Sequence, residues 1–128
     1  VQTCALPIFM ISSTVKKAWG KEIIFANNNN YCGKLLVHDK AGSKGSMHYH
    51  MLKHETWYVQ SGSFTVRWIN TSNAEMNEDT LKPGDVWCNE PGQPHQLIAL
   101  EDNSVIFEVS TEHLDSDSYR VLPGDSQK

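Results

Sequence analysis

The chain has 128 residues, which predicts one domain with a single core. Hydrophobic residues make up 39% and charged residues 20%, a composition typical of folded rather than disordered chains. Lys and Arg number 11 against 15 Asp and Glu, for a net charge of -4. Because there is no basic run and no apolar run of membrane-spanning length, neither a nucleic acid nor a membrane is an expected partner. The three cysteines stand far apart, which argues against disulfides and favours a reducing cytoplasm.

The first nine residues are predicted to stand outside the domain. The chain begins without Met, and its opening resembles translated adapter sequence, so Met10 is the expected native start. We expect residues 1–9 to be a non-native or disordered extension, residues 10–122 to form the domain, and residues 123–128 to be a polar tail.

Short runs rich in Val, Ile, Thr and aromatic residues alternate with turn signals along the chain. The predicted strands cover residues 22–26, 35–38, 56–60, 64–69, 86–88, 96–100 and 105–109. Phe64, Val66 and Trp68 share one face of their strand, as the alternation of side chains in a strand requires. No run is typical of an amphipathic helix, and the polar residues after 109 are predicted to be irregular. Many short strands at even spacing predict an all-β sandwich or barrel.

Three of the six histidines are candidate metal ligands. His48 and His50 stand two residues apart, so on a strand both side chains project from one face and can bind the same ion. Glu55 can fold back beside them only if a hairpin or bulge runs through residues 51–54. His95, which follows a turn, is a candidate third imidazole. Three nitrogens and one carboxylate oxygen leave two octahedral positions open, which suits Zn, Mn, Fe, Co or Ni.

The spacing of these residues resembles that of the cupin superfamily. The first cupin motif is reproduced in full by Gly42, His48, His50, Glu55 and Gly62. The second motif is met in part by Gly84, Gly92 and His95. Glu90 and Ala99 stand where the usual proline and asparagine are found. The resemblance covers residues 42–100 and implies a cupin-type double-stranded β-helix, or jelly roll, with the metal inside the barrel.

The flanking residues are more specific. Residues 17–20, 48–59, 106–109 and 119–122 resemble the cupin domain of type II mannose-6-phosphate isomerases. That family commonly has glutamine where this chain has His48, and arginine where it has Gln96. The string His-x-His-x-x-Lys-x-Glu is instead similar to the cupin D-lyxose isomerases. The resemblance implies a metal-dependent aldose–ketose isomerase acting on a sugar or sugar phosphate.

Two cations are the expected catalytic residues of such an isomerase. The metal would chelate O1 and O2 of the open-chain sugar, which leaves charge and proton transfer to the protein. Lys53 would stabilise the enediolate, hold a phosphate or, with a lowered pKa, move the proton itself. Arg120 would close over the barrel mouth and meet an anionic substrate. His54 is expected to be exposed, and Cys88 to be a buried, inert thiol.

Other interpretations stay open. The same ligands resemble those of Fe(II) cupin dioxygenases, and small cupins also serve as sugar-binding modules without turnover. His38 and His113 have no spacing that links them to the cluster. A homodimer is expected, because a minimal barrel exposes sheet edges. Core packing is the expected role of the aromatic residues Trp57, Tyr58, Phe64, Trp68, Trp87 and Phe107.

Overall fold

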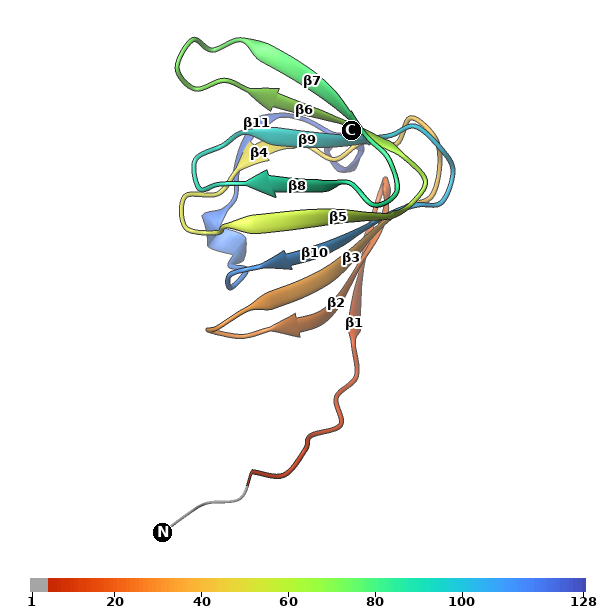
Figure 1. Ribbon diagram of the computed structural model, residues 1–128, viewed down its shortest axis with the longest axis vertical. Coiled ribbons are helices and arrows are strands. Elements are labelled where there is room, and N and C mark those ends of the chain that lie inside the picture. The colour runs from red at the N-terminus through yellow and green to blue at the C-terminus, as the bar shows by residue number, and fades with distance from the viewer. Residues whose placement is uncertain (1–4) are drawn as a thin grey trace.

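The computed structural model describes residues 5–128, which fold into two antiparallel β-sheets (Figure 1). The strands are β1 (Ser13–Lys17), β2 (Gly20–Asn27), β3 (Cys32–His38), β4 (Met47–Tyr49), β5 (Glu55–Ser61), β6 (Phe64–Ile69), β7 (Met76–Leu81), β8 (Val86–Asn89), β9 (His95–Ala99), β10 (Ser104–Ser110) and β11 (Tyr119–Leu122). Two 3-10 helices, η1 (Asp115–Asp117) and η2 (Asp125–Gln127), flank β11. Residues 5–128 contain no helix able to span a membrane.

The two sheets enclose the interior of a jelly roll, as the sequence predicts. The six-stranded sheet has the order β1-β2-β3-β10-β5-β8, and the five-stranded sheet has the order β11-β4-β9-β6-β7. Neighbours such as β3 and β10 lie far apart in the sequence, which is typical of this topology. The core between the sheets includes Val59, Phe64, Val66, Leu81, Ala99 and Ile106.

The strand predictions differ from the structure mainly where strands are polar. The seven predicted runs appear as β2, β3, β5, β6, β8, β9 and β10. Four further strands, β1, β4, β7 and β11, were not predicted from apolar alternation. The prediction that the residues after 109 are irregular is wrong for β11, which pairs with β4. Backbone pairing at a sheet edge needs no apolar pattern, so such strands leave little signal in the sequence.

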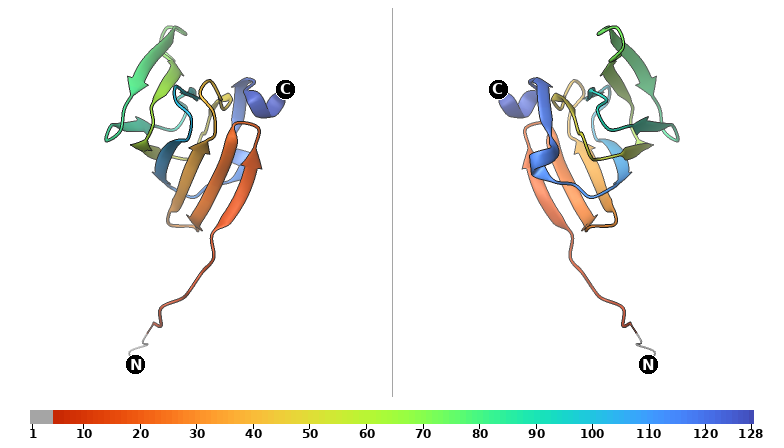
Figure 2. Two further views of the ribbon diagram at one scale, coloured as in Figure 1. Left: turned by 90° about the vertical axis from the view of Figure 1, so that its right-hand side faces the viewer. Right: turned by 90° about the vertical axis from the view of Figure 1, so that its left-hand side faces the viewer.

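The last residues fold back onto the domain. The Asp125 carboxylate accepts a hydrogen bond from the backbone N–H of Lys44 (2.9 Å), and the Ser126 hydroxyl accepts one from that of Ala18 (3.0 Å). Figure 2 shows η2 near the turn between β1 and β2, with the N-terminal segment leading away from the sheets. Residues 123–128, expected as a polar tail, therefore pack against the body. Of the predicted extension 1–9, residues 1–4 lie outside the described residues, and 5–9 are exposed without secondary structure.

Candidate metal centre

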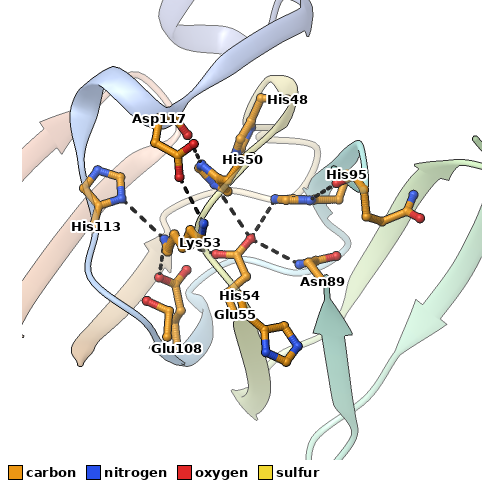
Figure 3. Close-up of polar contacts among 12 residues, drawn as sticks. His48, His50, Lys53, His54, Glu55, Asn89, His95, Glu108, His113 and Asp117 are labelled. Carbon is orange, nitrogen blue, oxygen red and sulfur yellow. Dashed lines mark hydrogen bonds and ion pairs between the residues drawn. The ribbon is translucent and has the colours of Figure 1, made fainter. Parts of the chain in front are cut away.

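Three imidazoles meet inside the barrel (Figure 3). His48 lies in β4 and pairs in register with His95, the first residue of β9, while His50 directly follows β4. One ring nitrogen of each histidine lies within 4.8 Å of those of the other two. Strand β4 therefore presents His48 and His50 on one face, and β9 brings His95 beside them from 45 residues away in the chain.

Backbone carbonyls orient all three rings. Each Nδ1 contacts a carbonyl oxygen: that of Ser46 for His48 (3.0 Å), of Asp117 for His50 (2.7 Å) and of Gln93 for His95 (2.8 Å). A carbonyl oxygen only accepts, so each Nδ1 must carry the proton. In the neutral ring, the Nε2 lone pair then remains for a metal, as in known metal sites where an outer partner sets the tautomer.

Glu55 completes the cluster from the opposite sheet. Residues 51–54 reverse the chain so that Glu55, at the start of β5, points back toward the histidines. Its Oε1 lies 2.7 Å from Nε2 of His95 and 3.9 Å from Nε2 of His50. Within residues 5–128, the buried His95 Nε2 has no hydrogen-bond partner, so two acceptors face each other and need a cation or a proton between them. The donor set therefore fits a divalent metal.

The protonation states of these groups also suit a metal. Burial, reinforced by His95 and His50, lowers the pKa of His48 to about 3. Burial also lowers the pKa of His50. The pKa of Glu55 falls well below its usual range, because the attraction of His95, Lys53 and His50 outweighs the effect of burial. Near pH 7, His48 and His50 are neutral and Glu55 is ionised, as metal ligands must be.

Lys53 lies next to this cluster in a buried network of charges. Its ammonium is 2.8 Å from Oε2 of Glu108 and 3.1 Å from Oε2 of Glu55. Burial lowers the pKa of Lys53, but Glu108 and Glu55 raise it by more, so the net shift is upward. Lys53 is therefore a positively charged ammonium at neutral pH. The alternative prediction, that a lowered pKa lets Lys53 move the proton itself, is wrong. Its two carboxylate neighbours are the physical reason.

Glu108 is a site residue that the sequence analysis did not single out. It lies in β10 on the same face as Ile106, and its Oε1 accepts a hydrogen bond from the indole N–H of Trp57 (3.2 Å). Burial and the nearby charge of Glu55 raise the pKa of Glu108. The one available signal was the alternation in β10, which puts a glutamate on the apolar face of that strand.

His113 was also missed. Its Nδ1 lies 3.4 Å from the Lys53 ammonium, and its ring centroid is 6.3 Å from that of His50. The residue stands between β10 and η1, in a segment with no motif or periodicity. No sequence signal could have placed it here, because the position depends on how the C-terminal segment crosses the barrel mouth.

The structure distinguishes the remaining sequence candidates. Arg120 pairs in register with His48, is exposed and lines the cavity described below. His54 is exposed, as predicted, and its Nε2 is 3.0 Å from the sulfur of Cys88. The prediction that Cys88 is buried is wrong. Its neighbour Asn89 points inward and donates to Glu55 (3.3 Å), so strand alternation turns Cys88 outward.

A cavity of about 720 Å³ opens beside the cluster. Such a volume is typical of sites that bind small molecules. The four candidate ligands, Lys53, Glu108 and His113 all line it, and so does His38. Its other walls combine the cations Lys17, Lys34 and Arg120 with the apolar residues Val15, Trp19, Ile24, Leu36 and Leu97.

Asp117, in η1, anchors the loop that carries the cluster. Its carboxylate accepts hydrogen bonds from the backbone N–H groups of Met51 (2.8 Å), Leu52 (3.2 Å) and Lys53 (3.0 Å). Its carbonyl accepts the Nδ1–H of His50. Burial raises the pKa of Asp117, but these N–H groups lower it by more, to below its ordinary 3.8. The C-terminal segment thus positions both the loop 51–54 and one candidate ligand.

Replacing Asp117 with alanine is expected to weaken metal binding about 10- to 100-fold, as loss of an outer-shell partner does. We also expect a loss of about 1–2 kcal/mol in the free energy of unfolding, because three N–H acceptors disappear. The stabilisation is complete above pH 3.8 and is lost as the pH falls toward the lower folded-state pKa. Titration calorimetry and urea unfolding measure both effects. Ser116→Ala, at an exposed position in the same 3-10 helix that does not line the cavity, is the matched control and should change neither.

The comparisons with known proteins agree with this architecture. A family profile described as "Cupin domain" matches residues 35–111, and the chain belongs to that family. No curated protein matches the chain.

Among solved structures, the chain is similar to the capsular polysaccharide assembling protein CapF from Staphylococcus aureus (TM-score 0.76, 19% identity, 89% of this chain and 33% of that one). It is also similar to oxalate decarboxylase from Bacillus subtilis (TM-score 0.76, 19% identity, 86% of this chain and 30% of that one). KdgF from Halomonas sp. gives a TM-score of 0.64 at 23% identity, over 75% of this chain and 81% of that one. The chain spans about a third of the length of the first two, and these likenesses establish the fold.

Proposed function

We propose that this protein is a metal-dependent isomerase that interconverts the aldose and ketose forms of a sugar or sugar phosphate. One observation carries the proposal. A buried ammonium, Lys53, lies 3.1 Å from the candidate metal ligand Glu55 and 2.8 Å from a second buried carboxylate, Glu108, in one small-molecule cavity. An isomerase of this kind needs a chelating metal, a fixed positive charge and a group that moves a proton, and these residues can supply all three.

His48, His50, Glu55 and His95 would hold the metal. When bound, the metal supplies Lewis-acid polarisation of the carbonyl and keeps two adjacent sugar oxygens together. The Lys53 ammonium stabilises the negative charge that develops on those oxygens as the C2 proton leaves. Because Glu55 and Glu108 hold this ammonium in place, little reorganisation is needed during the reaction.

We assign proton transfer to Glu108. Its carboxylate takes the proton from C2, the C2–H electrons form the double bond to C1, and the electrons of the C1 carbonyl move to O1. The O2 proton then passes to O1, the carbonyl forms at C2, and the electrons of the C1–C2 double bond take the proton back at C1 from the same carboxyl. A raised pKa brings a carboxyl closer to the working pH, at which proton transfer in both directions is efficient. In the reverse direction the proton moves from C1 to C2.

Cations elsewhere in the cavity favour a substrate with an anionic group. Lys17, Lys34 and Arg120 line the wall beside the cluster, and Arg120 is exposed. A guanidinium binds phosphate oxygens in a bidentate manner, which suits a sugar phosphate. The positive charge of Lys34 is partly compensated by the Glu22 carboxylate, 3.4 Å away. Arg120 and Lys17 are therefore the stronger candidates for binding the anionic group of the substrate.

Proton NMR in D2O, on protein loaded in turn with each candidate metal, tests the proposal against a panel of aldoses, ketoses and their 6-phosphates. We expect one aldose–ketose pair to interconvert, with deuterium at C1 or C2 of the product. Glu108→Gln should reduce this exchange at least about 100-fold, the scale of general acid–base catalysis, while metal affinity changes little. Glu75→Gln, at an exposed position that does not line the cavity, is the control and should leave the rate unchanged.

Several outcomes would contradict the proposal. Conversion without deuterium would replace proton transfer with a hydride shift and remove the role of Glu108. Absence of conversion with every metal would exclude isomerisation of these sugars. Oxygen uptake by the Fe(II)-loaded protein would point to a dioxygenase, and tight sugar binding without turnover would point to a binding module.

A further inference from the structure

The floor of the cavity extends beyond the metal cluster, across the strands that neighbour β10 in the six-stranded sheet (Figure 1). Lys34, in β3, is in register with Glu108 of β10, and both side chains line the cavity. On the next strand, β2, Glu22 also lines the cavity, and its Oε2 lies 3.4 Å from the Lys34 ammonium. The proposed reaction does not use this Glu22–Lys34 pair.

The Lys34 ammonium is buried with hydrogen-bonding capacity left over. Its side chain is 3% exposed, and an ammonium carries three N–H donors. Within residues 5–128, Glu22 supplies the only acceptor within hydrogen-bonding distance of this ammonium, and the contact is long. Buried polar groups in proteins are normally hydrogen-bonded, because an unmet donor costs free energy. The remaining N–H groups of Lys34 are therefore available to a ligand in the cavity.

The Glu22 carboxylate has spare acceptor capacity at the same place. A carboxylate accepts several hydrogen bonds through its two oxygens, and in the described part of the chain only Lys34 donates to this one. The register partners of Glu22 are Val15 of β1 and Leu36 of β3, which also line the cavity. These apolar side chains offer no competing hydrogen bonds. The pair thus presents donors and acceptors side by side between apolar neighbours.

The two charges of the pair favour a ligand group that is neutral and that both donates and accepts hydrogen bonds. An anion placed here would be repelled by the Glu22 carboxylate, and a cation by the Lys34 ammonium. A hydroxyl group can accept from the ammonium and donate to the carboxylate. Such hydrogen bonds to charged groups are stronger than those between neutral groups. Two neighbouring hydroxyls of a sugar therefore match the pair.

We propose that Glu22 and Lys34 form a subsite that binds two neighbouring hydroxyl groups of the substrate, remote from its carbonyl. The proposal rests on the isomerase function above, which places C1 and C2 beside the metal ligands and Glu108. Adjacent strands lie about 4.8 Å apart, roughly the length of three to four carbon–carbon steps in an extended chain. Because Lys34 is one strand away from Glu108, the hydroxyls on C4 and C5 reach the pair. The substrate class is then an open-chain sugar of at least five carbons.

Titration calorimetry of the metal-loaded protein with glycerol, erythritol, xylitol and sorbitol tests the proposal without turnover. These polyols have three, four, five and six carbons, and adjacent hydroxyls at one end can chelate the metal. We expect the affinity to rise about 10- to 100-fold between erythritol and xylitol, the gain typical of a hydrogen bond to a charged group. The double variant Glu22→Gln with Lys34→Met removes both charges together. It should abolish this step and leave the affinities for glycerol and for the metal unchanged.

Glu22→Gln alone is a second variant that does not depend on how the double variant folds. Glutamine has the same shape, and the Glu22 side chain is 19% exposed, so the packing is kept. It should reduce the step, because a neutral amide oxygen is a weaker acceptor than a carboxylate. Lys21→Met is the matched control, since Lys21 is exposed in β2 and does not line the cavity, and it should keep the full step. Circular dichroism and thermal unfolding establish that each variant is folded.

The polyol series also separates the subsite from the isomerase function. A step in the wild type that is lost in the double variant supports the subsite even if no sugar of the NMR panel is converted. Equal series in the wild type and the double variant would overturn the subsite even if the panel identifies a substrate. A wild type that binds all four polyols equally, or a step that Lys21→Met also abolishes, would overturn it as well.

Discussion

Replacing His95 with alanine is expected to lower the affinity for a divalent metal by more than about 100-fold. This loss exceeds the one expected for an outer-shell partner such as Asp117, because His95 is itself a candidate ligand. The His95 Nε2 is buried, finds no hydrogen-bond partner in the described part of the chain and faces Oε1 of Glu55 at 2.7 Å. Its ring is also fixed by Gln93, so the chain has already ordered this ligand before the metal binds. Titration calorimetry with Zn, Mn, Fe, Co and Ni salts, together with metal analysis of the purified protein, measures the effect.

The metal-free His95→Ala protein gives a second result that needs no activity. Loss of the ring removes the largest of the attractions that hold the pKa of Glu55 down, so more of the Glu55 carboxyl should be protonated at a given acidic pH. His54→Ala is the matched control, because His54 is an exposed histidine one residue before Glu55. Its affinity should equal that of the wild type. Equal metal binding by His95→Ala would exclude this cluster as the metal site.

Replacing Lys53 with methionine is expected to cost about 3–5 kcal/mol in the free energy of unfolding, the usual result of removing one partner from a buried ion pair. Methionine has a similar length and no charge, so Glu55 and Glu108 would face each other in the barrel without compensation. The pKa of Lys53 is raised above its ordinary 10.5, so its stabilisation is complete at pH 7 and is lost only as the pH rises through the folded-state pKa. Urea unfolding of the metal-free protein at pH 7 measures the cost.

The double variant Lys53→Met with Glu108→Gln separates charge from packing. Removing the negative charge of Glu108 as well should recover roughly half of the free energy of unfolding that Lys53→Met loses. Such a coupling is expected for groups in direct contact. Lys34→Met, which removes a buried lysine with one longer contact to Glu22 at 3.4 Å, should cost less than Lys53→Met. A cost below about 1 kcal/mol for Lys53→Met, the level of an exposed pair, would mean that the network contributes little.

Much of the candidate site follows from local spacing. His48 and His50 share a face wherever β4 forms, because side chains alternate along any strand. Alternation alone could not place Glu55 beside the histidines, because residues 50 and 55 are an odd number of positions apart and would lie on opposite faces of a continuous strand. The structure resolves it with the reversal through residues 51–54, held by Asp117. That anchor is 64 residues or more beyond the loop, so no local pattern could reveal it.

The sequence by itself determined seven of the strands and the all-β class, which follow from alternation along one segment. It also determined the spacing of four candidate ligands, whose resemblance to the cupin motif implies the jelly roll. Only the tertiary structure decided which face of each strand points inward. The inward face of β10 places Glu108 beside Lys53, and its outward face leaves Phe107 exposed. The outward face of β8 carries Cys88. The physical reason is that alternation defines two faces of a strand, whereas only packing of the second sheet determines which face becomes the interior.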